Sequence, residues 1–365
     1  MQDSTQIFSL LPPFQLQPPP SKNRSHSESD RRYVDELTDY CAFSIYYRVV
    51  TADIAPALEK RVGLALGSIN GFVRGKPGSV ELALTFLLAG GHLLLEDVPG
   101  TGKTSLARAL ALSLRVEWKR IQFTPDLLPS DVTGVSIYRD GSFEFHAGPV
   151  FASVVLADEI NRASPRTQAA LLEAMEEKSV TVDGVTHALP SPFMVLATQN
   201  PVDMAGTYPL PEAQLDRFLM RLSLGYPDLA TEVEIVAAHH AGSSVDDITA
   251  VMTTEELIGL ISSASLIDVP ETVQRYLVEI VAATRTAAGV ALGASPRGSI
   301  GLLRAARALA LIRGRIFVTP GDIQELAVPV LAHRLVLNAD AIALGKTQAD
   351  VVREVVESIP APQGI

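Results

Sequence analysis

Short apolar runs alternate with helix-like segments through the middle of the chain. The runs lie at residues 93–95, 121–123, 154–157, 195–198 and 219–224. Apolar residues at helical spacing separate most of them, most clearly over residues 165–177. Buried strands that alternate with helices are typical of a parallel sheet with helices on both faces, so the sequence predicts an α/β fold here.

The pattern changes at both ends of this region. After Pro227 it is helical throughout, with periodic segments at 254–264, 271–287, 299–313 and 320–336. Residues 1–52 hold several prolines and then the polar run 21–32, which cannot bury enough apolar surface to offset the entropy of ordering. We expect a disordered N-terminal extension at 1–52, an α/β domain at 53–227 and an all-helical domain at 228–365. A partner-binding tail is the alternative for the extension.

Composition indicates a folded and acidic protein. Of the 365 residues, 47% are hydrophobic and 19% are charged, and 41 acidic against 30 basic residues give a net charge of −11. Such a chain is a poor general nucleic-acid binder, and the arginines at 304, 307, 313 and 315 are predicted to form a solvated helix face. The single cysteine, Cys41, excludes an intrachain disulfide. No apolar run reaches the roughly 20 residues that cross a membrane, so we expect a cytoplasmic protein.

A glycine-rich turn follows the first buried strand and precedes a helix. Gly100 and Gly102 permit backbone conformations in which successive N–H groups point at phosphates, and the helix N-terminus adds a positive dipole. Lys103 can reach the β- and γ-phosphates of a nucleotide, and the Thr104 hydroxyl can ligate Mg²⁺. Asp97 stands where the strict phosphate-loop pattern has its first glycine, which leaves the nucleotide affinity open. The predicted phosphate-binding residues are Val98, Pro99, Gly100, Thr101, Gly102, Lys103, Thr104 and Ser105.

Polar residues also end two later strands. Asp158 and Glu159 follow the buried run 154–157, and Asn200 follows the run 195–198. The carboxyl ends of parallel strands are where ligands of open α/β sheets bind. There Asp158 would complete the Mg²⁺ shell, Glu159 would polarise an attacking water and Asn200 would orient it. An ordinary strand end and an Asn-Pro turn are the alternatives for these positions.

Together these motifs resemble the AAA+ ATPases and, within them, the MoxR family. The resemblance covers about residues 73–333, and its most specific segments are 95–104, 122–134, 158–163, 171–177, 197–201, 209–218 and 294–297. It implies an AAA+ P-loop NTPase core, built on a parallel sheet with helices on both faces, and a C-terminal all-helical lid. It also matches Lys103 and Thr104 to Walker A, Asp158 and Glu159 to Walker B, and Asn200 to sensor 1.

The resemblance assigns two further arginines. Arg217 matches the arginine finger that reaches a neighbouring subunit's nucleotide, and Arg297 matches sensor 2 on the lid. An always-charged, planar guanidinium suits the charge that develops on a transferred phosphoryl group. A local ion pair with Asp216 is the alternative for Arg217, with Arg162 and Arg166 as rival fingers. A solvated lid arginine is the alternative for Arg297.

Two hairpins are predicted at 134–150 and 180–189, around Asp140-Gly141 and Asp183-Gly184. In relatives with such insertions the hairpins line or flank the pore of a ring, and ordinary edge hairpins are the alternative.

The function implied by the resemblance is ATP hydrolysis with Mg²⁺ in a homo-oligomeric ring, expected to be a hexamer. The ring would act in chaperone-like maturation of partner proteins, often proteins with a von Willebrand factor A domain. A chelatase-type or DNA-linked AAA+ motor is one alternative. A nucleotide-switched scaffold that scarcely hydrolyses ATP is another.

Overall fold

The computed structural model describes residues 60–98, 100–139, 141–200, 207–240 and 247–363. The chain divides into two units after Asp53, and all described residues belong to the second unit. The predicted extension at 1–52 and Pro99 of the glycine-rich turn lie outside the described residues. Within that part of the chain, no helix combines the length and apolar character needed to cross a membrane.

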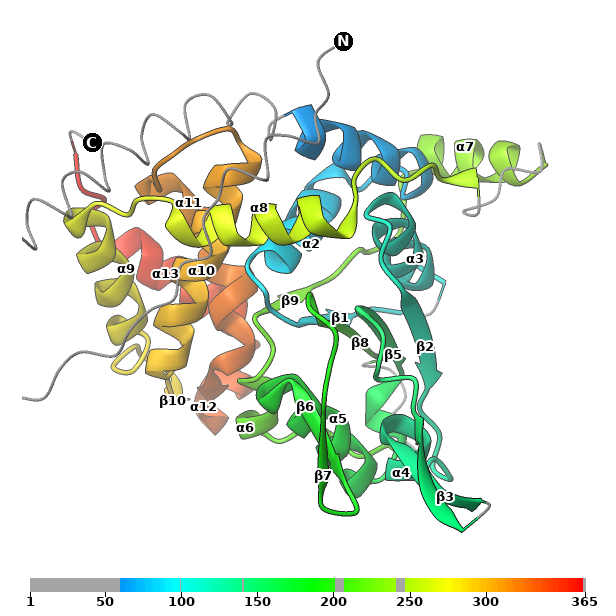
Figure 1. Ribbon diagram of the computed structural model, residues 1–365. Helices are drawn as coiled ribbons and strands as arrows, with labels where there is room; N and C mark the ends of the chain where they lie inside the picture. The colour runs from blue at the N-terminus through cyan, green and yellow to red at the C-terminus, as the bar shows by residue number, and fades with distance from the viewer. Residues whose placement is uncertain (1–59, 99, 140, 201–206, 241–246, 364–365) are drawn as a thin grey trace, which may run out of the picture. The chain divides into compact units, whose positions relative to one another are not determined.

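Five parallel strands form the central sheet, in the spatial order β2–β5–β8–β1–β9 (Figure 1). They are β1 (Leu93–Glu96), β2 (Trp118–Gln122), β5 (Val154–Asp158), β8 (Met194–Gln199) and β9 (Met220–Leu222). The predicted parallel sheet is confirmed, although β2 begins three residues earlier than the apolar run and β9 is shorter. Because all neighbours are parallel, the carboxyl ends of β1, β5 and β8 meet at one edge.

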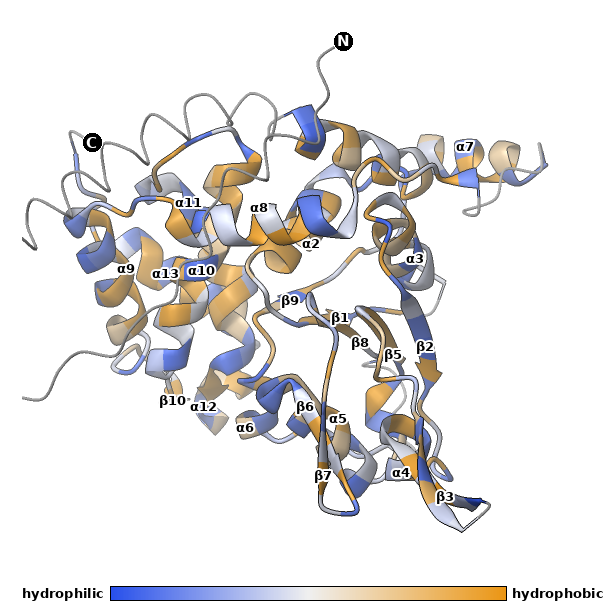
Figure 2. Cartoon of the chain, in the orientation of Figure 1, coloured by the Kyte–Doolittle hydropathy of each residue, from blue (hydrophilic) through white to orange (hydrophobic). Residues whose placement is uncertain are grey.

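Both faces of the sheet are buried. Leu93 and Leu95 belong to one hydrophobic cluster, whereas Leu94 between them belongs to a second. The helices α2 (Pro77–Leu88) and α3 (Lys103–Ser113) supply the first cluster, and α5 (Pro165–Glu177) supplies the second. Side chains that alternate in a strand therefore meet apolar partners on either side, which explains the continuous apolar runs (Figure 2).

Both predicted hairpins are present. The first joins β3 (Gly134–Arg139) to β4 (Ser142–Ala147) after the short helix α4 (Pro129–Thr133), and the second joins β6 (Ser179–Val182) to β7 (Val185–Ala188). They lie side by side at one end of the molecule, where the rings of Phe145 and His187 stack with centroids 3.9 Å apart (Figure 1). Their role at a pore stays a prediction.

In its described residues, the C-terminal region is mostly helical, with one short antiparallel ribbon and an isolated bridge between Asp268 and Phe317. Its helices are α7 (Leu229–His240), α8 (Thr254–Leu266), α9 (Glu271–Ala283), α10 (Pro296–Ile312), α11 (Pro320–Leu331), α12 (Ala339–Ala343) and α13 (Gln348–Ser358). The strands β10 (Val290–Leu292) and β11 (Val336–Leu337) pair antiparallel. Buried residues of α8–α11 join the same cluster as α2 and α3, so the apolar core continues from the sheet into the lid.

Two lid helices end earlier than their periodicity predicts. The helix expected to reach residue 336 ends at Leu331 and passes into a 3-10 turn, Ala332–Arg334, where Arg334 Nε donates to the Val330 carbonyl (2.8 Å). The helix expected to reach residue 287 ends at Ala283. There the buried Thr284 hydroxyl donates to the Val281 carbonyl (2.6 Å) and accepts from the Ala294 N–H (3.0 Å).

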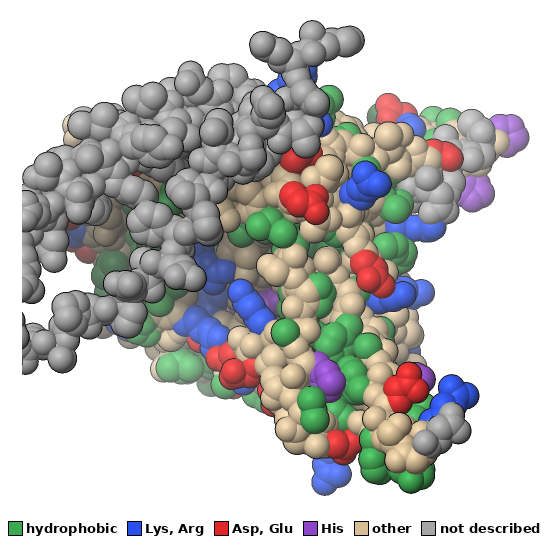
Figure 3. All heavy atoms as spheres, in the orientation of Figure 1, with side chains coloured by type: hydrophobic (Ala, Val, Ile, Leu, Met, Phe, Trp, Pro, Cys, Tyr) green, Lys and Arg blue, Asp and Glu red, His purple; other side chains and the backbone are tan. Residues whose placement is uncertain are grey.

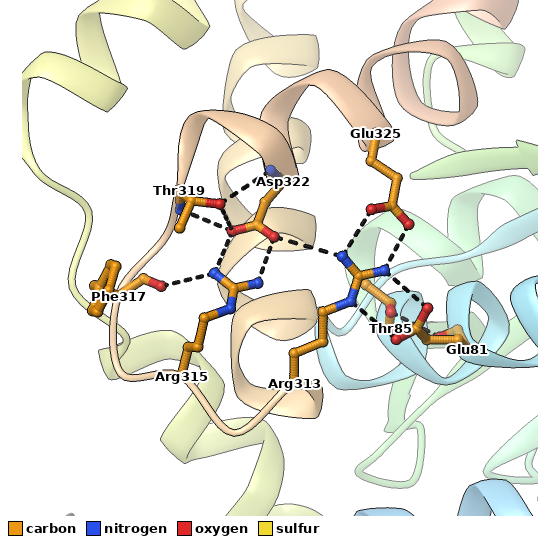
Figure 4. Close-up of polar contacts among 8 residues, drawn as sticks. All are labelled: Glu81, Thr85, Arg313, Arg315, Phe317, Thr319, Asp322 and Glu325. Carbon is orange, nitrogen blue, oxygen red and sulfur yellow. Dashed lines mark hydrogen bonds and ion pairs between the residues drawn. The ribbon is translucent and has the colours of Figure 1, made fainter. Parts of the chain in front are cut away.

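Arg304 and Arg313 are exposed, as the predicted solvated face requires, but they also join the lid to the α/β body, which the sequence did not predict. Arg304 donates to the Ala89 and Gly90 carbonyls at the end of α2. Arg313 lies between Glu81 of α2 and Glu325 of α11 and bonds both carboxylates at 2.7–3.1 Å (Figure 4). The acidic partners sit on other helices, which is why charge counting along the sequence could not find them.

Asp322 is the buried member of this network. Its carboxylate accepts two bonds from Arg315, at 2.6 and 2.7 Å, and one from the Thr319 N–H at 2.8 Å (Figure 4). Burial by itself raises the pKa of Asp322, but the bonds from Arg315 and Thr319 outweigh it and hold that pKa below its ordinary value. The ionised carboxylate therefore stabilises the start of α11 at neutral pH.

We predict that Asp322→Ala lowers the free energy of unfolding by about 3 kcal/mol, since it removes a helix cap and leaves Arg315 without its buried partner. Urea unfolding monitored by circular dichroism measures this. Asp350→Ala is the matched control, because Thr347 and Asp350 form the same capping box in the open on α13. Equal losses for the two variants would show that burial of Asp322 contributes nothing.

Candidate active site

A cavity of about 340 Å³ lies at the carboxyl edge of the sheet. It is lined by Gly100, Gly102, Lys103, Thr104, Ser105, Asp158, Glu159, Thr198, Gln199 and Asn200. Three separate sequence motifs thus meet at one place because β1, β5 and β8 are parallel neighbours. Val98 and Thr101 of the predicted phosphate-binding set belong to the same turn but do not line the cavity.

The glycine-rich turn has the shape of a phosphate cradle. Gly100 and Gly102 have φ of 85° and 89°, and Gly102 is the residue immediately before α3. A Cβ placed on either glycine would meet no atom within 4 Å, so the space beside the turn is open. Lys103 Nζ donates to the carbonyls of Asp97 (3.1 Å) and Val98 (2.7 Å), which keeps the ammonium at the turn. These features fit a nucleotide phosphate chain.

Asp97 connects the turn to the segment after β9. Its Oδ2 accepts from the N–H groups of Leu224 and Gly225, both at 2.7 Å, and its Oδ1 accepts from the Val98 N–H at 2.9 Å. The side chain is buried, with 6% of its residue surface exposed. A glycine could form none of these bonds, so the departure from the strict pattern gives the turn an additional anchor.

Thr198 of β8 organises the acidic pair at the end of β5. Its hydroxyl donates to Asp158 Oδ1 (2.7 Å) and accepts from the Glu159 N–H (2.8 Å). Glu159 has φ of 56°, a left-handed conformation that a non-glycine residue adopts only when its surroundings impose it. The bond from the Glu159 N–H to Thr198 holds this turn and directs the carboxylate to the cavity.

The neighbouring strand β2 contributes two side chains that sequence reasoning missed. Arg120 donates to Asp158 Oδ2 at 2.6 and 3.1 Å, and Gln122 donates to Glu159 Oε2 at 3.0 Å. Glu159 also pairs with Arg162 at 3.2 Å. The available signal was Gln122 within a predicted buried run, with Arg120 directly before it. Its meaning depends on strand order, because β2 is the neighbour of β5.

Arg217 and Arg297 do not lie at this cavity. They line a second cavity, of about 170 Å³, together with Gly91 and His92, which immediately precede β1. The second cavity is therefore at the amino edge of the sheet, opposite the first. Both arginines bind Glu176, whose Oε2 is 3.0 Å from Arg217 and whose Oε1 is 2.9 Å from Arg297.

The segment that carries Arg217 is joined to the lid. Asp216, which a local ion pair of Arg217 would use, pairs instead with the buried Arg334, and it accepts a bond from the Ser295 hydroxyl at 3.1 Å. Arg334 also donates to the Phe218 carbonyl at 2.7 Å. Arg297 follows Pro296 at the first turn of α10, as predicted from the sequence.

Comparison with known proteins decides the family. A model described as "ATPase family associated with various cellular activities (AAA)" matches residues 92–220, and an "AAA lid domain" model matches residues 282–355. The Mycobacterium tuberculosis protein named Chaperone MoxR1 is 43% identical over 310 residues, which cover 82% of this chain and 82% of that protein. The chain belongs to the MoxR family of AAA+ ATPases.

Further similar proteins include a second one named MoxR. The Bacillus subtilis protein YeaC is 50% identical over 307 residues, covering 84% of this chain and 96% of that protein. Protein MoxR of Paracoccus denitrificans is 34% identical over 300 residues, covering 75% and 88%. A crystal structure from Cytophaga hutchinsonii, whose name describes a proposed ATPase, has a TM-score of 0.81 and 35% identity over 88% of this chain and 100% of its own. The predicted fold class, an AAA+ P-loop core with a helical lid, is confirmed.

In this MoxR chain we predict that Asp97→Gly, which restores the strict glycine pattern, lowers the free energy of unfolding by about 2 to 4 kcal/mol and gains no ATP affinity. The substitution leaves the N–H groups of Leu224 and Gly225 without their acceptor. Urea unfolding and titration with a fluorescent ATP analogue measure the two effects. Glu96→Gln is the control, since it breaks only the half-exposed pair with Arg221 and should cost less than about 1 kcal/mol. A stability gain for Asp97→Gly would refute the anchoring role.

Proposed function

We propose that this protein hydrolyses ATP at the carboxyl-edge cavity, within a homo-oligomeric ring, and uses the energy to remodel partner proteins. The observation that carries the proposal is the convergence of the glycine-rich turn, the acidic pair and Asn200 on one cavity of about 340 Å³. ATPase activity is a property of the AAA+ family to which the chain belongs.

Each side chain has a task that its position supports. Lys103, now bonded to turn carbonyls, would exchange these for the β- and γ-phosphates. Glu159 would accept the proton of the attacking water, and Asn200 would orient that water. Thr104 and Asp158 would hold Mg²⁺, which neutralises phosphate charge when bound. Arg120 would hold the Asp158 carboxylate in place from β2.

The two arginines favour a site shared between subunits. Arg217 and Arg297 lie at the amino edge of the sheet, whereas the phosphate turn lies at the carboxyl edge of the same subunit. Both would therefore act on the ATP of a neighbour, and repetition of that contact closes a ring, for which we propose a hexamer. Fixed guanidinium groups there would stabilise the charge that develops on the transferred phosphoryl group.

A chaperone-like role is the proposed use of this ATPase. The relative named Chaperone MoxR1 supports it, and the paired β3–β4 and β6–β7 hairpins offer a surface for clients. We propose a cytoplasmic location and a partner with a von Willebrand factor A domain on family resemblance. The DNA-linked alternative is weakened because Arg304, Arg313 and Arg315 bond groups within the protein.

We predict that Glu159→Gln retains ATP and loses at least about 100-fold in turnover, because an amide is a poor base. Phosphate release and binding of a fluorescent ATP analogue measure the two properties. Lys103→Ala is the contrasting variant, since it should lose tight binding itself. Wild-type turnover in Glu159→Gln would assign water activation to another group, and negligible turnover in the unaltered protein would favour a nucleotide-switched scaffold.

We predict that two inactive variants restore activity when mixed. Arg217→Ala subunits keep an intact Glu159 site, and Glu159→Gln subunits keep an intact Arg217, so some interfaces of a mixed ring hold every catalytic part. An arginine finger supplies a factor of about 10³ to 10⁵ in turnover, so a modest recovery stands clear of background. Inactive mixed rings, verified by native mass spectrometry, would overturn action of Arg217 between subunits.

A further inference from the structure

The second cavity is strongly basic. It is lined by Lys178, Arg217, Arg297, Arg304 and Arg334, against only two carboxylates, Glu176 and Asp216. Basic side chains gather in the hollow between the α/β body and the lid helices (Figure 3). Asp216 is engaged by Arg334, and Arg304 bonds the end of α2. Among the residues that line this cavity, Glu176 is therefore the one carboxylate available to pair with Arg217 and Arg297.

Glu176 binds these two arginines one on each oxygen. Oε1 meets Arg297 at 2.9 Å and Oε2 meets Arg217 at 3.0 Å, so one planar carboxylate sets the separation of the two guanidinium groups. Two cations this close repel each other, and an anion between them offsets the repulsion. The side chains of Glu176, Arg217 and Arg297 are 35%, 29% and 46% exposed, so the cluster remains open to a neighbouring subunit.

The backbone on either side of this contact is firmly held. Glu176 lies in the last turn of α5, which is followed by Lys178 with φ of 52°. His92 is buried, and because the Val195 N–H donates to its Nδ1 (3.0 Å), its Nε2 carries the proton and donates to the Met175 carbonyl (3.1 Å). Burial lowers the pKa of His92 to about 4, so this bond persists at neutral pH.

Arg297 is fixed from the lid side. The Ser295 hydroxyl accepts from the Arg297 N–H (3.2 Å) at the start of α10, and it also donates to Asp216, the neighbour of Arg217. Glu176 therefore closes a cycle of contacts that joins α5, the segment before β9 and the lid. A shift of the lid relative to the body would change the geometry of both arginines together.

We propose that Glu176 is a positioning residue that presents Arg217 and Arg297 as a pair to the γ-phosphoryl group of the neighbouring subunit's ATP. This inference rests on the proposed function. The phosphoryl group binds the outward N–H groups of both guanidinium planes while Glu176 holds their inner sides. Loss of the carboxylate lets the two cations separate and lowers the stabilisation that they provide together.

The first test replaces Glu176 with Gln, which keeps the size and removes the charge. Turnover at saturating ATP should fall about 10- to 100-fold, as for a misplacement of catalytic groups by about 1 Å. The dissociation constant of a fluorescent ATP analogue and the melting temperature should stay near the wild-type values, because the subunit's own phosphate turn is untouched. Glu177→Gln, the next residue on the same helix and exposed, is the matched control and should retain wild-type turnover.

The second test assigns Glu176 to one side of the interface. Mixed with Glu159→Gln, the Glu176→Gln variant should regain activity, because each supplies the half that the other lacks. Mixed with Arg217→Ala it should gain none, because both defects lie on the arginine side. The reverse pattern would place Glu176 in its own subunit's site and overturn the inference, as would full activity of Glu176→Gln alone.

The mixture of Arg217→Ala with Glu159→Gln separates the two hypotheses. If this reference mixture recovers and the Glu176 mixtures do not follow the stated pattern, only the role of Glu176 fails. If verified mixed rings of the reference pair stay inactive, the shared site itself fails. Should Glu176→Gln melt at a lower temperature, Glu176→Asp keeps the charge on a shorter arm and should recover part of the turnover. No recovery in a folded Asp variant would contradict positioning by charge.

Discussion

The common direction of the five strands is the constraint on which the rest of this structure depends. Parallel neighbours cannot be joined by tight turns, so each crossover needs a helix, and helices then cover both faces of the sheet. Apolar side chains fill the two faces, and polar residues are left to the strand ends. Because every carboxyl end points the same way, the phosphate turn after β1 and the acidic pair after β5 face one cavity with Asn200 after β8.

The same constraint separates the two halves of the proposed catalytic machinery. The residues proposed to bind phosphate collect at the carboxyl edge, and Arg217 lies on the segment before β9, at the amino edge. A subunit cannot bring these two edges together, which is why we propose that a second copy completes the site. The contacts of Glu176 with an arginine of the body and an arginine of the lid make the arginine side sensitive to the lid's position.

Charged residues form ion pairs between elements of the fold as well as covering its surface. Although the chain carries a net charge of −11, carboxylates such as Glu81, Asp216 and Asp322 bind arginines between elements. These ion pairs act in addition to a continuous apolar core. Because they are directional, they fix the orientation of α10 and α11 against the α/β body. The lid is therefore held to the body by packing and by directed ion pairs together.

Local signals in the sequence determined much of this protein. Strand and helix periodicity, the glycines of the phosphate turn and the acidic pair after β5 are short-range patterns, since each depends on residues close together in the chain. They were sufficient for the fold class, the positions of the hairpins and most residues of the first cavity, but they missed Thr198 and Gln199 and included Val98 and Thr101, which do not line it. Element ends were less accurate: α9, for example, ends where the Thr284 hydroxyl accepts from the Ala294 N–H, a contact that depends on the folded lid.

Only the tertiary structure decided the long-range partners. The acceptor role of Asp97 toward Leu224 and Gly225, the bonds of β2 side chains to the acidic pair and the capture of two arginines by Glu176 all join residues far apart in the chain. One sequence permits many such pairings, because it gives the type of each charged side chain but not which residue will lie beside it in the folded protein. Strand order and the packing of α10 against α2 and α11 select the partner, so these contacts emerge only when the chain is folded.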